Sequence, residues 1–135
     1  PIVTTLHGLG AMPHDHPLML GMPGMHGWVH VNRAIQRCDV LFNIGSRFDD
    51  RVTGKVSAFA PHARIIHVDV DPAEIGKLVE AQVGIVGDAR DVLETITPRL
   101  PVEPQRHAEW LAEIAELQAQ FQPRQHYTRP TRTAA

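Results

Sequence analysis

Charged residues and a glycine lie at the ends of three apolar runs in this sequence. They are Gly45, Arg47, Asp49, Asp69 and Asp88. A guanidinium group can pair with a phosphate through two parallel hydrogen bonds, and a carboxylate at a strand end can accept the hydroxyls of a ribose. Glycine lets the backbone approach a ligand closely. These residue types favour a site for a nucleotide that carries phosphates and sugar hydroxyls.

Short strands are the elements that must position these side chains. Residues 40–44, 64–70 and 83–86 are mostly apolar, and residues 2–6 are rich in β-forming types. Runs that are apolar on both faces are typical of buried strands in a parallel sheet. With loops or helices between them, they imply right-handed βαβ units, so the predicted fold class is α/β, with a doubly wound, mostly parallel, Rossmann-like sheet.

Ligands bind beyond the carboxyl ends of the strands in such a sheet. We therefore expect the five residues above to meet at one edge. The strand at residues 2–6 would bring Thr5 and Leu6 to the same edge. No GxGxxG sequence follows any predicted strand, so the standard dinucleotide fingerprint is absent.

Some of these residues have a plainer interpretation. Asp71 and Asp88 stand where a helix N-cap is expected, and Asp is a preferred cap. Arg47 has the alternative of a surface salt bridge, which would give it no special role. Asp69 lies inside a strand end, where no capping role is expected.

Helices are predicted between and after the strands. One covers residues 29–37, another begins at Asp71, and a third covers 89–100. Asp71 is followed by Pro72 and Glu74, which is the pattern of an N-cap, a first-turn proline and a capping box. Residues 11–27 contain many Pro and Gly and are expected to form a loop.

Residues 101–135 are predicted to be organised differently from the rest of the chain. Residues 101–104 indicate a linker, and residues 108–121 predict an amphipathic helix. Its apolar face consists of Trp110, Ile114, Leu117 and Phe121. The polar tail from Gln122 is expected to lack regular structure. The chain therefore divides into residues 1–100, a ligand-binding domain, and residues 101–135, a linker, helix and tail.

Composition narrows the class of protein. The chain has 135 residues, 43% of them hydrophobic and 21% charged, with a formal net charge of −2. Neither a basic stripe nor a membrane-spanning apolar run is present, which argues against nucleic acid and membrane partners. The one cysteine, Cys38, fits a reducing cytoplasm and is more typical of a packed residue than of a nucleophile.

A metal site is not predicted. His14, Asp15 and His16 are the best candidate ligands. Structural zinc sites need four convergent ligands at recognisable spacing, which this stretch does not supply.

Four stretches of the sequence resemble one family. Residues 4–10, 24–27, 45–55 and 67–77 are similar to the middle domain of acetolactate synthase (acetohydroxyacid synthase) catalytic subunits. The run Arg-Phe-Asp-Asp-Arg-Val-Thr-Gly-Lys within the third stretch is long and unusual. The resemblance covers about residues 1–100.

The resemblance implies a three-domain enzyme that depends on thiamine diphosphate and Mg²⁺. Such an enzyme joins two 2-oxoacids, pyruvate with pyruvate or with 2-oxobutyrate, and releases carbon dioxide in branched-chain amino acid synthesis. Its middle domain holds FAD, which has no net redox role. It also implies a homo-oligomer, dimer or tetramer, with a regulatory subunit as a further partner.

Residue by residue, the resemblance implies a set of FAD contacts. They are Thr5, Leu6, Gly24, Met25, His26, Gly45, Arg47, Phe48, Asp49, Asp69, Val70, Asp88 and Ala89. Met25, Asp50 and Arg51 would lie at the substrate channel, where Arg51 would steer the carboxylate of a 2-oxoacid. The alternative for Asp50 and Arg51 is a salt bridge that shapes the loop.

The resemblance also implies what other parts of a parent enzyme supply. Thiamine diphosphate and Mg²⁺ would be bound by domains outside this chain, so we expect no catalytic residue in it and no turnover by it alone. The first strand and helix of the FAD domain are not recognised in the sequence. Two rival hypotheses are another FAD-containing carboligase, such as glyoxylate carboligase, and a non-catalytic nucleotide-binding module.

Overall fold

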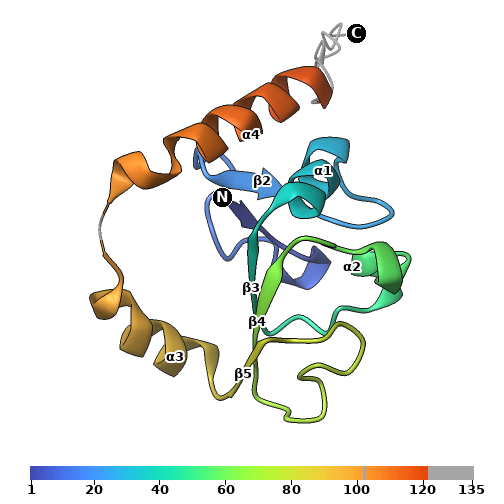
Figure 1. Ribbon diagram of the computed structural model, residues 1–135, viewed down its shortest axis with the longest axis vertical. Helices are drawn as coiled ribbons and strands as arrows, with labels where there is room; N and C mark the ends of the chain where they lie inside the picture. Colours follow the sequence, from blue (N-terminus) through green and yellow to red (C-terminus); the bar gives the residue numbers. More distant parts are fainter. Residues whose placement is uncertain (102, 122–135) are drawn as a thin grey trace, which may run out of the picture.

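The computed structural model describes residues 1–101 and 103–121 and has an α/β fold built on parallel strands (Figure 1). The strands are β1 (Ile2–Val3), β2 (Met19–Gly21), β3 (Val40–Ile44), β4 (Arg64–Asp69) and β5 (Val83–Val86). The α-helices are α1 (Val29–Arg37), α2 (Asp50–Thr53), α3 (Ala89–Ile96) and α4 (Ala108–Phe121). The predicted fold class is confirmed.

Strands β3, β4 and β5 form one parallel sheet in that order. Val40 pairs with Arg64 and Ile44 with Val68, while Asp69 pairs with Val86. The predicted bounds of β3 and β5 are correct, and β4 ends one residue earlier than predicted. β4 carries the most buried residues of the sheet, which fits its place between β3 and β5.

The N-terminal part differs from the prediction. The strand expected at residues 2–6 is β1 alone, and residues 6–8 form a 3₁₀ turn. The predicted loop of residues 11–27 contains β2, which pairs with β1 in a separate two-stranded parallel sheet. A strand of three residues is too short to show the alternation by which strands are recognised.

The helix predicted from Asp71 does not form. Residues 71–79 make successive turns in which Glu74 N–H donates to the Asp71 carbonyl and Lys77 N–H donates to the Glu74 carbonyl. The Asp71 side chain still accepts from the Ala73 N–H at 2.9 Å, as a cap would. Gly76 adopts φ 72°, a left-handed conformation that ends helical turns.

Helix α3 begins where predicted and ends four residues early, and a 3₁₀ turn at Thr97–Arg99 continues it. Pro98 lies in that turn, where the missing N–H of proline ends the α-helical ladder. The expected linker at residues 101–104 includes residue 102, and the expected irregular tail begins at residue 122. Residue 102 and the tail lie outside the described residues.

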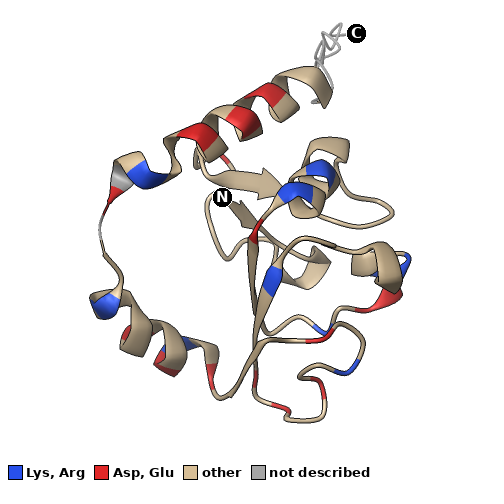
Figure 2. Ribbon diagram, viewed as in Figure 1, with Lys and Arg blue, Asp and Glu red and all other residues tan. Residues whose placement is uncertain are grey.

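Helix α4 packs against α1, and its predicted bounds are correct. Ile114 and Leu117 are buried, and Trp110 and Phe121 are half-buried against the same core, so the predicted apolar face is the packed one. Figure 2 shows acidic positions along α4 and basic positions on α1. One such pair, Arg37 Nη1 and Glu113 Oε1, lies 2.8 Å apart on the exposed side of the contact.

The packing of α4 gives a stability prediction. Ile114→Ala should lower the free energy of unfolding by about 2–4 kcal/mol, because it opens a cavity in a buried contact. Leu111→Ala on the same helix is the control, because Leu111 is 36% exposed. It should cost under about 1 kcal/mol. Urea unfolding followed by circular dichroism measures both, and equal losses would contradict the packing of α4 on α1.

Candidate functional site

The carboxyl ends of β3, β4 and β5 lie side by side. Gly45 N–H donates to the Val68 carbonyl at 2.8 Å, and Gly87 N–H donates to the Asp69 carbonyl at 3.0 Å. Both bonds continue the sheet ladder for one residue past a strand end. The segments that follow Ile44, Asp69 and Val86 therefore leave the sheet at one edge. This is the edge at which α/β folds bind ligands.

Gly45 leaves room for a ligand at this edge. Its φ of 62° is a left-handed conformation that side chains rarely adopt, and no atom lies within 4 Å of the position a Cβ would take. A glycine here allows the turn out of β3 and keeps the backbone accessible.

Residues 47–49 divide between the core and the surface. Phe48 is 3% exposed and adopts φ 54°, a left-handed conformation that is uncommon for a residue with a side chain. Its ring packs edge-on against Phe59 and His67, with centroids 5.6 and 5.0 Å away. The ring of Phe48 is therefore part of the core.

The side chain of Arg47 projects to the surface instead. It is 70% exposed, and its Nη2 lies 3.8 Å from Asp49 Oδ2. The carboxylate of Asp49 also caps α2 by accepting from the Arg51 N–H at 3.1 Å. An exposed ion pair at this distance contributes little to stability, so the Arg47 guanidinium can turn to another anion at low cost.

The carboxylates of Asp69 and Asp88 both accept hydrogen bonds from backbone N–H groups. Asp69 is 8% exposed, and its Oδ1 accepts from the Asp71 N–H at 2.9 Å. No helix follows Asp69 before β5, so it caps none, and its bond is the common one from Asp to a backbone N–H two residues on. Asp88 is exposed and caps α3, accepting from the N–H groups of Arg90 and Asp91 at 2.8 and 3.4 Å.

The remaining predicted FAD contacts near the strand ends differ in how exposed they are. Leu6 and Val70 are 65% and 68% exposed, and Thr5 and Ala89 are half-buried. His26 is exposed in the loop before α1.

Two cavities separate the predicted residues into groups. The larger, about 820 Å³, is lined by Thr5, Gly45 and Phe48, together with β1 and β3. The smaller, about 330 Å³, is lined by Gly24, Met25 and Asp50. Asp69 and Asp88 line neither cavity. The strand ends lie at one edge of the sheet. The side chains that were expected to line one cleft lie at separate places on that edge.

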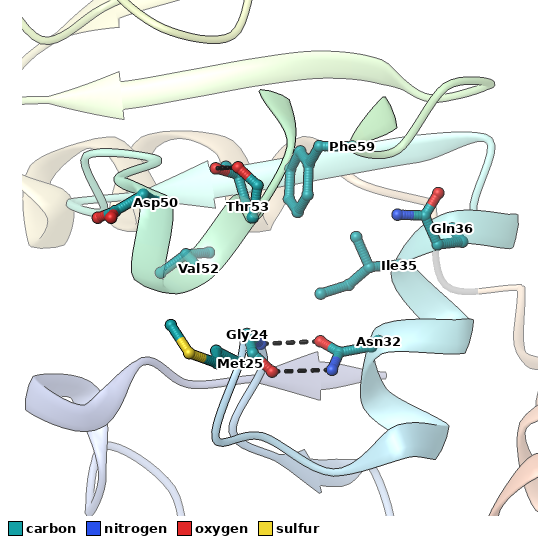
Figure 3. Close-up of a pocket in the computed structure, with 10 residues that line it drawn as sticks. Gly24, Met25, Asn32, Ile35, Gln36, Asp50, Val52, Thr53 and Phe59 are labelled. Atoms are coloured by element: carbon teal, nitrogen blue, oxygen red, sulfur yellow. Dashed lines mark hydrogen bonds between the residues drawn. The ribbon is translucent and has the colours of Figure 1, made fainter. Parts of the chain in front are cut away.

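The smaller cavity joins two segments that are distant in the sequence (Figure 3). Met25 N–H donates to the Arg51 carbonyl at 3.3 Å. Gly24 adopts φ 94°, and a Cβ there would lie 1.8 Å from the same carbonyl oxygen. Only glycine permits this approach, so Gly24 holds Met25 beside the helix that carries Asp50 and Arg51.

Asn32 on α1 fixes this contact from the other side. Its Nδ2 donates to the Gly24 carbonyl at 2.9 Å, and its Oδ1 accepts from the Gly24 N–H at 2.8 Å. Figure 3 shows both bonds at the wall of the cavity. Sequence reasoning missed Asn32, because nothing in a helical polar residue indicates a partner eight positions earlier in a loop.

The three predicted channel residues are brought together with accessible side chains. Met25 is 63% exposed, and the side chains of Asp50 and Arg51 are 79% and 70% exposed. Arg51 Nε lies 4.0 Å from Asp50 Oδ1, a loose ion pair. Both interpretations of Arg51, a carboxylate-steering group and a loop-shaping ion pair, therefore stay open.

Other chemistry has less support. In residues 1–101 and 103–121, no group of three or more His, Cys, Asp or Glu side chains is placed to hold a metal ion. Burial and the neighbouring Asp39 raise the pKa of the Cys38 thiol above its ordinary value, which disfavours the reactive thiolate. No helix in the same residues is long and apolar enough to cross a membrane.

Comparison with known proteins places this chain in a family. Residues 1–96 match the family model described as "Thiamine pyrophosphate enzyme, central domain". The chain is 52% identical to the acetolactate synthase large subunit of Corynebacterium glutamicum over 133 residues, which are 96% of this chain and 21% of that protein. It is 54% identical over 118 residues to the probable acetolactate synthase large subunit of Methanocaldococcus jannaschii, covering 87% of this chain and 20% of that one.

A further relative is the isozyme 2 large subunit of Escherichia coli acetolactate synthase. It is 49% identical over 117 residues, which are 87% of this chain and 20% of that protein. The chain thus spans about a fifth of the length of these relatives.

The role of Asn32 can be tested directly. Asn32→Ala should speed the hydrogen exchange of the Gly24 and Met25 amides at least tenfold, because it removes both bonds between α1 and Gly24. Gln36→Ala is the matched control, since Gln36 lines the same cavity from the same helix. Equal effects of the two variants would show that Asn32 does not hold the loop.

Proposed function

This chain belongs to the family of thiamine pyrophosphate enzyme central domains, and on that premise we propose that it is the central domain of an acetolactate synthase large subunit. The parent enzyme would condense two 2-oxoacids, pyruvate with pyruvate or with 2-oxobutyrate, with loss of carbon dioxide. What carries the proposal is that the identity to acetolactate synthase large subunits extends over nearly the whole chain.

We propose further that the carboxyl edge of β3–β5 binds FAD. The residues present fit such a group in three respects. Gly45 leaves the backbone open, and Arg47 offers an exposed guanidinium for a diphosphate. The N-terminus of α3 places the partial positive end of a helix at the same edge. Bound there, FAD would contribute structure to the parent rather than redox chemistry.

The remaining proposed FAD contacts would act in two ways, by meeting the cofactor or by fixing the loops around it. Thr5, Leu6, Val70 and Ala89 would meet the cofactor through accessible atoms beside the strand ends. Phe48, whose ring is buried, would do so from the wall of the larger cavity. Gly24, Met25 and His26 would approach from the loop before α1. Asp49, Asp69 and Asp88 would act mainly by fixing the loops in which they cap backbone N–H groups.

The contact between Met25 and the α2 segment supports a substrate role for the same region. We propose that Arg51 steers the carboxylate of the incoming 2-oxoacid, with Met25 and Asp50 beside it. Its side chain is exposed and only loosely paired, so it can reach an anion without breaking a strong contact.

Other parts of the parent complete the proposal. Thiamine diphosphate and Mg²⁺ would be held by domains outside this chain, and residues 1–100 would form the FAD domain, with residues 101–135 leading to the next one. The relatives are large subunits, which supports a small regulatory subunit as a partner. The oligomeric state and the cytoplasmic location stay predictions.

The FAD site is tested by Arg47→Ala in the full-length parent. Loss of a charge-assisted contact of about 1.5–3 kcal/mol should weaken FAD binding about tenfold to a hundredfold. Arg33→Ala, an exposed arginine on α1, is the control and should bind FAD normally. Flavin absorbance and fluorescence titration measure the effect. Unchanged affinity in Arg47→Ala would remove Arg47 from the site.

The role of Arg51 is tested by Arg51→Ala in the same protein. We expect kcat/KM for pyruvate to fall about tenfold or more while FAD content stays normal, because the carboxylate loses a charged partner. Arg33→Ala is again the control. Equal loss of activity and FAD would indicate a loop-shaping role instead.

The reaction itself is tested with the parent and the chain side by side. With thiamine diphosphate, Mg²⁺ and FAD present, the parent should form acetolactate from pyruvate and the 135-residue chain should not. Flavin in a parent that forms no acetolactate would favour a related carboligase that acts on glyoxylate. Absence of both flavin and turnover would favour a non-catalytic nucleotide-binding module.

A further inference from the structure

The loop from Met22 to Trp28 is held in one shape by its own hydrogen bonds. Trp28 N–H donates to the Met22 carbonyl at 3.0 Å, and Gly27 N–H donates to the Gly24 carbonyl at 3.0 Å. A Cβ on Gly27 would overlap the Met22 carbonyl, so the two ends of the loop are in direct contact. The backbone of Met25, in the middle of the loop, is therefore placed by the loop as a whole.

One hydrogen bond joins this loop to the segment that contains α2. The bond from Met25 N–H to the Arg51 carbonyl is the only one between residues 22–28 and 45–59 in the part of the chain that the structure describes. At 3.3 Å it is slightly longer than most N–H···O bonds, so it depends on other contacts to persist. The two backbones touch beside it, since a Cβ on Gly24 would overlap the same carbonyl.

Asn32 on α1 orients the peptide group that makes this bond. The Gly24 carbonyl and the Met25 N–H belong to one planar peptide group. Asn32 Nδ2 donates to the carbonyl of that group, whose N–H donates in turn to the Arg51 carbonyl. Hydrogen bonds in such a chain polarise and strengthen one another. Asn32 Oδ1 also accepts from the Gly24 N–H, which fixes the preceding peptide group. Figure 3 shows Asn32 reaching from α1 to Gly24, with Met25 beside it.

The backbone of Arg51 is thus held at both of its polar groups. Its N–H donates to Asp49 Oδ1 at 3.1 Å, and its carbonyl accepts from the Met25 N–H. The Arg51 side chain itself is 70% exposed. The contacts therefore fix where the side chain begins and leave the guanidinium accessible. This matters for a group that must meet a substrate, because a misplacement of about 1 Å can cost about a hundredfold in rate.

From these contacts we propose that Asn32 is a positioning residue for the reaction, which acts by placing Arg51 through the peptide group between Gly24 and Met25. The inference rests on the proposed function, because it takes Arg51 as the group that meets the carboxylate of a 2-oxoacid. Asn32 does not touch the substrate itself, since both polar atoms of its side chain are bonded to Gly24.

A double-mutant cycle in the full-length parent tests this role. The measurement is kcat/KM for pyruvate at FAD concentrations that saturate every variant, checked by flavin content. Asn32→Ala alone should lower kcat/KM at least fivefold. In the Arg51→Ala background the same substitution should change kcat/KM less than twofold, because the group that Asn32 places is absent. Arg33→Ala, an exposed neighbour on the same helix, is the control and should leave kcat/KM unchanged.

Asn32→Asp keeps the test decisive if Asn32→Ala does not fold. Aspartate has the same size and can still accept from the Gly24 N–H, but it has no donor for the Gly24 carbonyl. It should lower kcat/KM at least threefold alone and less than twofold in the Arg51→Ala background.

The outcomes separate this inference from the proposed function. A fall of the same size with and without Arg51 would show that Asn32 does not act through Arg51 and would overturn the inference alone. Wild-type kcat/KM in both Asn32 variants would overturn it in the same way, because the loop would then place Arg51 without Asn32. A wild-type parent without turnover, or normal kcat/KM in Arg51→Ala, would overturn the proposed function and this inference with it.

Discussion

The parallel pairing of β3, β4 and β5 is the constraint on which the candidate site depends. Because the three strands run in the same direction and in register, their carboxyl ends meet at one edge. The loops that leave this edge carry Gly45, Arg47 and Asp88. Without the pairing, residues spread over more than forty positions of the chain would have no reason to be neighbours.

A close backbone contact connects this edge to a second region of the structure. The contact of Gly24 with the Arg51 carbonyl is possible only without a Cβ, and Asn32 holds it through two hydrogen bonds. This contact joins the loop before α1 to the segment that follows β3. The proposed cofactor site on the sheet edge and the proposed substrate channel at Met25 and Arg51 would therefore lie on connected segments, with Phe48 between them buried in the core.

The sequence predicted the elements whose signals are local and strong. Helices α1 and α4 and strands β3 and β5 have the predicted bounds, because amphipathic helices and runs that are mostly apolar are visible in the sequence itself. β2 was missed since it is three residues long, and the helix at Asp71 was wrong because Gly76 adopts a left-handed conformation. The bond from the Asp71 N–H to Asp69 and the two bonds of Asn32 to Gly24 depend on backbone positions that residue types alone do not reveal. The separation of β1 from β3 likewise follows from pairing rather than from composition.

The central claim is that the carboxyl edge of β3–β5 binds FAD in the intact parent. Hydrogen exchange of the full-length protein with and without FAD tests it most directly. The account predicts slower exchange at residues 45–49 and at Asp88 and Ala89 when FAD is bound, with little change along α4. Protection confined to other segments, with these amides unaffected, would contradict it.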